Sequence, residues 1–283
     1  MRKEPDFVSG KNMIFRKGHE DVSDSQRVMA KQRDKRIFID CIVCMAIGAI
    51  VRLFYCLSYF VPVRDAFVYE EYIRQWILQG NIPDGFLFPP LGPFILRIPA
   101  LYFDTDIMKG GIVVNMILGL CIISVLVLIS KEILSSDLIA TGLGIIAAVH
   151  PSLVHYSCHL LRENTFLLFS SLAVLCALRH MKFHTRRNVV FSAVFTVMAT
   201  LCRHEGIELL AVFCVLFFLN PTKPDCATRF KTVFLFLISG FAALFLISYA
   251  VGISSDFYLS YPHTLKNYFN EEAETVIFSG KMQ

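Results

Sequence analysis

Long apolar stretches separated by short polar segments run through most of this 283-residue chain. Several approach the roughly 20 apolar residues that a helix needs to cross a bilayer. The pattern predicts seven membrane spans, at residues 37–61, 110–130, 138–153, 165–178, 189–201, 207–219 and 233–253. The fold class that follows is all-α, a polytopic transmembrane helical bundle. Arg52, inside the first span, is expected to snorkel or to pair with a carboxylate in the bundle.

The segment after the first span, residues 62–109, has an amphipathic pattern. Apolar residues recur at helical spacing on one face: Tyr69, Tyr72, Ile73, Trp76 and Ile77. Gly80 provides a natural helix stop, and such a helix is expected to lie in the membrane interface. A shorter apolar piece, 91–103, contains prolines and is expected to be re-entrant or interfacial.

Composition supports a membrane protein, because 55% of the residues are hydrophobic and the mean hydropathy is +0.57. The net charge of +4 is concentrated in a few short segments, which indicates topology and excludes a nucleic-acid footprint. The basic start predicts a cytoplasmic tail, 1–36, with no removable signal peptide. A transmembrane module, 37–253, follows, with 62–109 as its first external loop. Residues 254–283 are expected to form an external C-terminal segment.

Counting spans from a cytoplasmic N-terminus places three polar clusters on the outer face. They are Arg64–Asp65, the stretch from His155 to Glu163, and Arg203–Glu205. Ionisable residues at span ends in an apolar chain usually belong to a site or to an internal pair. The three clusters therefore predict a shared external cavity.

Asp65 is the first candidate for a general base. It lies at the start of the amphipathic segment, where a helix N-terminus favours a carboxylate. A base must be ionised and within reach of an acceptor hydroxyl, which suits this position. The alternative is that Asp65 only caps the helix.

His155, His159 and Glu163 follow one another at steps of four residues. If this stretch is one helix, the three side chains share a face. They could then hold zinc or manganese, or form a hydrogen-bonded polar stripe inside the bundle. Both interpretations stay open, and a divalent metal is the candidate cofactor.

Arg203 and Glu205 interrupt an otherwise apolar stretch. Half-spans around a polar break present side chains to charged ligands, and an arginine can hold a phosphate in a bidentate manner. Arg162 is a second candidate for this role. The alternative is a self-neutralising charge pair, Arg203–Glu205 or Arg162–Glu163.

The order of these motifs resembles a known family over residues 37–219. The matching features are Asp65 with Tyr69 and Tyr72, Pro89-Pro90-Leu91-Gly92-Pro93, Asn115, His150-Pro151-Ser152-Leu153, Arg162-Glu163 and Cys202-Arg203-His204-Glu205-Gly206. The chain resembles membrane glycosyltransferases of the GT-C fold, in the group that contains protein O-mannosyltransferases and lipid A aminoarabinose transferases.

The resemblance implies an inverting transfer of a sugar from a polyprenyl- or dolichyl-phosphate to a hydroxyl of a protein, lipid or glycan on the external face. It implies Asp65 and Glu163 as catalytic residues, with Arg203 and Arg162 on the donor phosphate. The supporting residues are then Tyr69, Glu70, Glu205 and His159. The expected location is a bacterial inner membrane with a periplasmic or external active face.

Two departures from the family pattern stand out. Asp65 is followed by Ala66 instead of a second acid, and Glu70 and Glu71 come one turn later. Family members are also longer, so the chain is expected to be a minimal core, a truncated reading frame or one part of a split enzyme.

Non-catalytic alternatives are a remnant or partner subunit with the same fold. A transporter is disfavoured, because the charges lie at span ends instead of mid-span.

Overall fold

The structure is a computed structural model that describes residue 32 and residues 35–58, 61–83, 88–103, 105–134, 136–220 and 225–253. Within these ranges the regular elements are helices and no strand occurs. The predicted basic tail falls mostly outside the described residues, and the predicted C-terminal segment, 254–283, falls wholly outside them. The all-α fold class is confirmed.

Four helices are long and apolar enough to cross a membrane. They are Lys35–Ser58, α5 (Ile107–Ile133), α8 (Glu163–Phe183) and α11 (Cys226–Val251). A bent pair, α6 (Asp137–Val149) and α7 (Pro151–Ser157), turns by 54° and gives up to five spans if it counts as one. The number seven stays a prediction, because α9 (Arg186–Cys202) and α10 (Gly206–Phe218) have only 17 and 13 residues.

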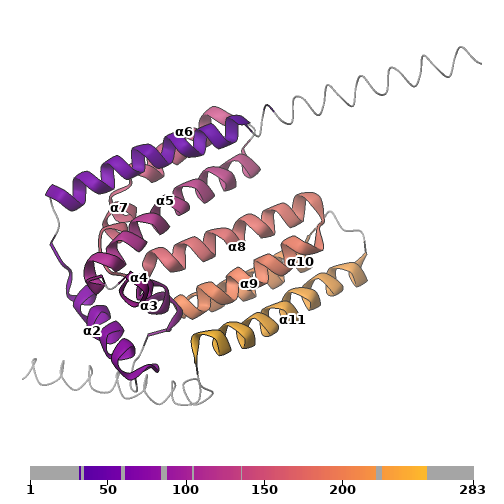
Figure 1. Ribbon diagram of the computed structural model, residues 1–283. Helices are drawn as coiled ribbons and strands as arrows, with labels where there is room; N and C mark the ends of the chain where they lie inside the picture. Colours follow the sequence, from indigo (N-terminus) through magenta and orange to yellow (C-terminus); the bar gives the residue numbers. More distant parts are fainter. Residues whose placement is uncertain are drawn as a thin grey trace, which may run out of the picture.

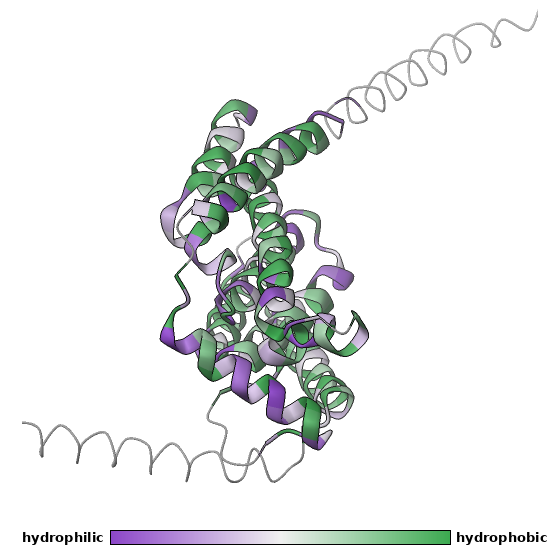
Figure 2. Ribbon diagram, turned by 60° about the vertical axis from the view of Figure 1, so that its left-hand side comes forward, coloured by the Kyte–Doolittle hydropathy of each residue, from purple (hydrophilic) through white to green (hydrophobic). Residues whose placement is uncertain are grey.

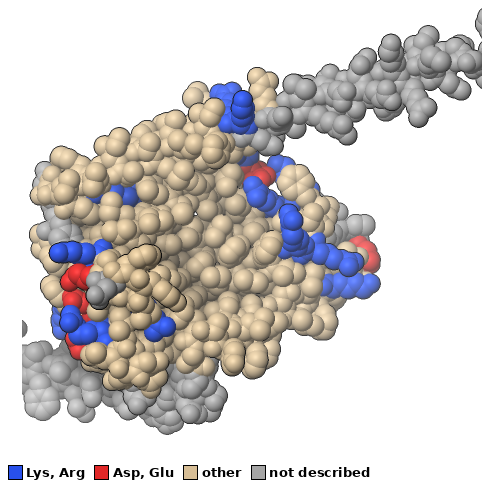
Figure 3. Space-filling model, viewed as in Figure 1, with Lys and Arg blue, Asp and Glu red and all other residues tan. Residues whose placement is uncertain are grey.

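The long helices lie side by side in one bundle (Figure 1). Its packing order runs from α6 to α5, then α8, α9 and α11. Hydrophobic residues dominate these helices, whereas α2 (Arg64–Gln79) at the bottom of the view carries several hydrophilic ones (Figure 2). Charged side chains gather toward the two ends of the bundle and leave an uncharged belt between them (Figure 3). This distribution is typical of a protein whose middle faces lipid.

The predicted amphipathic helix is α2, and it stops at Gly80 as expected, with φ at 73°. Its aromatic face is turned into the protein, where Tyr69, Tyr72 and Trp76 are 4%, 3% and 2% exposed. Trp76 packs on Phe94 of α3 (Leu91–Leu96). α2 therefore covers one end of the bundle, with its charged face outward.

The apolar piece 91–103 forms two six-residue helices, α3 and α4 (Ile98–Phe103). This agrees with the expectation that it is no clean span. α3 is largely buried against the bundle, whereas no residue of α4 is buried. Tyr102 and Phe103 are 77% and 73% exposed, so α4 presents aromatic side chains outward.

Arg52 behaves differently from the expectation that it snorkels or pairs with a carboxylate. It is fully buried in the helix Lys35–Ser58, and its partners in the described structure are a hydroxyl and backbone carbonyls. Nε donates to Ser157 Oγ at 3.0 Å, and Nη1 donates to Ala148 O at 3.0 Å. The physical reason is that the bend between α6 and α7 leaves carbonyls without helical partners, and the guanidinium supplies the donors.

Two glycines of α6 provide a matched test of this packing. A methyl group on Gly144 would overlap Val127 and lie 2.9 Å from Cys44 Sγ, whereas one on Gly142 would meet nothing within 4 Å. We expect Gly144→Ala to lower the free energy of unfolding by about 1–3 kcal/mol through overpacking. Gly142→Ala should leave it unchanged or raise it by about 0.5–1 kcal/mol. Thermal unfolding in detergent measures both, and equal effects would contradict this packing.

Candidate active site

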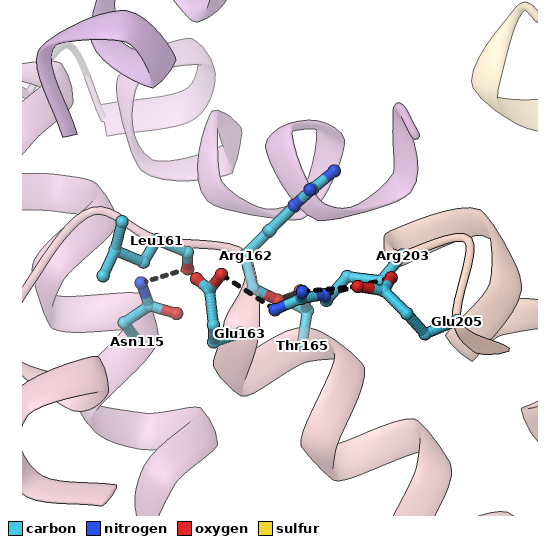
Figure 4. Close-up of polar contacts among 7 residues, drawn as sticks. All are labelled: Asn115, Leu161, Arg162, Glu163, Thr165, Arg203 and Glu205. Carbon is cyan, nitrogen blue, oxygen red and sulfur yellow. Dashed lines mark hydrogen bonds and ion pairs between the residues drawn. The ribbon is translucent and has the colours of Figure 1, made fainter. Parts of the chain in front are cut away.

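The site is built at the end of the bundle where α7 stops and α8 begins. α7 ends at Ser157, residues 158–162 cross the bundle end, and Glu163 starts α8. Asn115, buried in α5, donates its amide to Leu161 O at 2.7 Å (Figure 4). This bond fixes the backbone immediately before Arg162 and Glu163.

Arg203 lies at the C-terminal end of α9 and joins two carboxylates (Figure 4). Its Nη1 lies 3.1 Å from Glu163 Oε1, and its Nη2 lies 2.6 Å from Glu205 Oε1. Of the two predicted charge pairs, Arg203–Glu205 is present. Glu163 pairs with Arg203 instead of Arg162, and this brings together residues 40 positions apart.

Hydrogen bonding sets the protonation of this pair. The bond to Arg203 is the main cause that lowers the pKa of the Glu205 carboxyl to about 2. The same bond raises the pKa of the Arg203 guanidinium. The Arg203–Glu205 pair therefore stays charged at neutral pH, and Arg203 is shared between Glu205 and Glu163.

Arg162 differs from Arg203 because it has no carboxylate partner in the described part of the chain. Its guanidinium lies over the Phe88 ring, 4.5 Å from the centroid. Figure 4 shows it pointing away from Glu163 and Arg203. Its Nε and Nη1 are buried without a hydrogen-bond acceptor among the described residues. A cation held in this way can bind an incoming anion.

Tyr69 lies within electrostatic reach of charged residues from all three predicted clusters. Burial of the side chain raises the pKa of its hydroxyl, and the charged groups that shift this pKa further come from all three clusters. Arginines lower it and carboxylates raise it, and the four residues are Arg162, Glu163, Asp65 and Arg203. The side chains predicted as catalytic and phosphate-binding therefore all influence Tyr69, and the shared external cavity stays a prediction.

Asp65 lies in the first turn of α2 and is exposed. The N-cap of that helix is Val63, and no side chain makes a capping hydrogen bond. Asp65 is therefore not the N-cap of α2, and its role as a base stays a prediction. Glu70, a predicted supporting residue, pairs with Arg74 on its own helix at 2.6 Å.

The predicted shared face of His155, His159 and Glu163 is wrong, because the helix that carries His155 ends at Ser157. The two histidine rings lie 4.2 Å apart. Both ring nitrogens of His159 contact backbone oxygens, His155 O at 2.7 Å and Val61 O at 3.0 Å. Across the described ranges no three His, Cys, Asp or Glu side chains form a group that could hold a metal ion.

Sequence reasoning missed Arg97 and Asn164. Arg97 stacks on Trp76 at 4.1 Å and on Phe94 at 4.5 Å; a lone arginine inside an apolar stretch was the available signal. Asn164 is fully buried and donates to the backbone oxygen of Asn115 at 2.9 Å. No local pattern marks this residue, because its partner is 49 positions away.

The Arg203–Glu205 pair yields a pH prediction. The folded pKa of Glu205 lies below the ordinary value of 4.5, so its contribution to stability is complete above about pH 5 and is lost as the pH falls toward 2. Glu205→Gln should destabilise the protein at pH 7 by about 0.2–1 kcal/mol, the range for a half-exposed pair. The melting temperature of Glu205→Gln should therefore converge on that of the wild type as the pH falls from 5 to 2.

Glu208→Gln is the control for this experiment, because Glu208 makes no ion pair within the described residues. It should change the melting temperature at pH 7 less than Glu205→Gln does. If the melting-temperature difference between wild type and Glu205→Gln grew as the pH fell, the stabilising role of the Arg203–Glu205 pair would be contradicted.

Comparison with known proteins agrees with the sequence resemblance. No curated protein matches the chain. The family model for dolichyl-phosphate-mannose-protein mannosyltransferases matches residues 88–251, more than half of the chain. The match includes Arg162, Glu163, Arg203 and Glu205, whereas Asp65 precedes it. This family comprises membrane glycosyltransferases that use a polyprenyl-phosphate-linked sugar. The predicted resemblance is confirmed, and the chain belongs to the dolichyl-phosphate-mannose-protein mannosyltransferase family.

Proposed function

We propose that this protein transfers a sugar from a polyprenyl- or dolichyl-phosphate to an acceptor hydroxyl, at the bundle end where α2 packs against the segment that leads into α8. The observation that carries the proposal is the half-buried Arg162, whose Nε and Nη1 atoms are buried and have no acceptor among the described residues. It lies in the same electrostatic neighbourhood as Asp65, Glu163 and Arg203. An anion would complete this arrangement, and a lipid phosphate supplies one.

Arg162 is the better of the two predicted phosphate ligands. Arg203 already shares its charge with Glu163 and Glu205, so a phosphate would have to compete with two carboxylates. Buried N–H groups without an acceptor cost free energy, which a phosphate oxygen recovers through charge-assisted hydrogen bonds. In this assignment Arg162 binds the leaving phosphate, and Arg203 holds Glu163 in place.

Asp65 acts as the base in the proposed reaction. It takes the proton of the acceptor hydroxyl while the oxygen attacks the anomeric carbon of the sugar. The bond between that carbon and the phosphate oxygen breaks, and its electron pair leaves with the lipid phosphate, whose charge Arg162 stabilises. Glu163 Oε2 is buried and has no donor in the described structure, so it can accept a hydrogen bond from a hydroxyl of either substrate.

The distribution of charge supports a reaction on the external face. α8 runs from Glu163 at the site to Arg179 and Lys182, which pair with Glu132 at the opposite end. The start of the helix Lys35–Ser58 lies at that opposite end too, because Asp40 pairs with Lys131. The positive-inside rule assigns the basic end to the cytoplasm, which leaves the site on the other side.

The base assignment is tested by Asp65→Asn in a transfer assay with purified protein and a panel of polyprenyl-phosphate sugars, with and without EDTA. We expect kcat to fall by about 10²- to 10⁴-fold, because the acceptor proton has no base. Glu71→Gln, on the exposed face of the same helix, should retain activity. Normal turnover by well-folded Asp65→Asn protein would remove Asp65 from the mechanism and favour the non-catalytic alternative.

The phosphate assignment is tested by Arg162→Ala in the same assay. Loss of a charge-assisted hydrogen bond, worth about 1.5–3 kcal/mol, should raise the KM for the lipid donor by about 10- to 100-fold. Arg74→Ala, on the outer face of α2, is the control and should leave this KM unchanged. Unaltered donor affinity in Arg162→Ala would shift the phosphate contact to another residue.

A further inference from the structure

A buried clasp of two asparagines lies behind the candidate site. Asn115 of α5 donates its side-chain amide to His159 O at 2.6 Å and to Leu161 O at 2.7 Å. In return, Asn164 of α8 donates to Asn115 O at 2.9 Å and to Ser157 Oγ at 3.1 Å. Asn115, Ser157 and Asn164 are fully buried. The two amides donate in opposite directions, so α5 and the start of α8 are joined from both sides.

The clasp brackets the two residues that the proposed reaction uses. Leu161 O is held by Asn115 immediately before Arg162, and the Asn164 side chain is held immediately after Glu163. Residues 158–162 lie between α7 and α8, and helical hydrogen bonds hold only the ends of this stretch, from Cys158 N to Val154 O and from Phe166 N to Arg162 O. The two amides add the bonds that attach the middle of this stretch and the first turn of α8 to α5, and so they help to set where Arg162 and Glu163 lie.

The clasp also extends to the first membrane helix. Ser157 Oγ, which accepts from Asn164, also accepts from Arg52 Nε at 3.0 Å. Arg52 in turn donates to Ala148 O at the end of α6. Leu161 is buried, so removal of the Asn115 amide leaves Leu161 O without its donor. His159 O keeps its bond from Leu161 N.

We propose that Asn115 and Asn164 are positioning residues that set where the Arg162 guanidinium and the Glu163 carboxylate lie relative to the reacting atoms. This inference rests on the proposed function. The amides donate to backbone and hydroxyl groups of the protein itself, so they act only through Arg162 and Glu163. Displacement of a catalytic group by about 1 Å costs on the order of 100-fold in rate.

The kinetic test compares Asn115→Leu and Asn164→Leu with wild type. Leucine approximates the shape of asparagine and removes both donors. We expect kcat per folded molecule to fall by about 10- to 100-fold, with a smaller change in the KM for the acceptor. Ser192→Ala is the matched control, because Ser192 also makes a buried bond between helices, to Ala173 O at 3.1 Å, away from the site. It should lower stability and leave kcat unchanged.

A second measurement separates this inference from the proposed function, because it needs no activity. A double-mutant cycle of Glu163→Gln and Arg203→Ala on the melting temperature reports the coupling of that pair, 3.1 Å apart in the wild type. The coupling should be present in the wild type and in Ser192→Ala, and it should vanish in Asn115→Leu. If no donor supports transfer but the coupling is lost, the positioning role stands and the proposed function fails.

Two outcomes would overturn the positioning role. One is a variant that loses stability while its kcat per folded molecule stays normal. The other is coupling between Glu163 and Arg203 that survives in Asn115→Leu. If Asn115→Leu does not fold, Asn164→Ala serves in both experiments, because it removes the bonds to Asn115 O and Ser157 Oγ and leaves the bonds to His159 O and Leu161 O in place.

Discussion

The chain leaves helical geometry on both sides of α7, at the bend after α6 and again after Ser157. Side chains from other helices donate to the buried carbonyl oxygens at both places. Arg52 donates to Ala148 O at the end of α6, and Asn115 donates to His159 O and Leu161 O after the end of α7. The donors come from the first membrane helix and from α5, so these hydrogen bonds also join both helices to the segment around α7. The chain after Ser157 then leads to the start of α8, where Arg162 and Glu163 lie.

The two arginines at this end of the bundle have different electrostatic surroundings, and this difference defines the site. Arg203 is held between Glu163 and Glu205, and its charge is matched before any ligand arrives. Arg162 lies on the face of Phe88 and has no carboxylate partner among the residues that the structure describes. In such a site, the guanidinium that is paired with carboxylates can hold them in place, while the guanidinium without a carboxylate partner can bind a phosphate.

α2 contributes through its buried face. Because Tyr69 and Trp76 pack into the bundle, the helix is held firmly across its end. Asp65, one turn before Tyr69, is thereby presented at the exposed edge of the site and remains in electrostatic reach of the Tyr69 hydroxyl. An amphipathic pattern states only that one face avoids water. Either lipid or protein can cover an apolar face. The sequence therefore could not distinguish a helix that lies on the membrane from a helix that packs on the bundle.

The sequence by itself determined the class of the protein and where its charged groups fall along the chain. Apolar stretches of membrane length specify helices, and glycine and proline stop or bend them, because these effects are local. The same local patterns suffice to assign Asp65, Glu163 and Arg203 to helix ends. Only the tertiary structure decided which groups meet: Glu163 with Arg203 across 40 residues, and Asn164 with Asn115 across 49. It also separated His155 from Glu163, since the end of α7 is satisfied by side chains from distant elements, which no local spacing encodes.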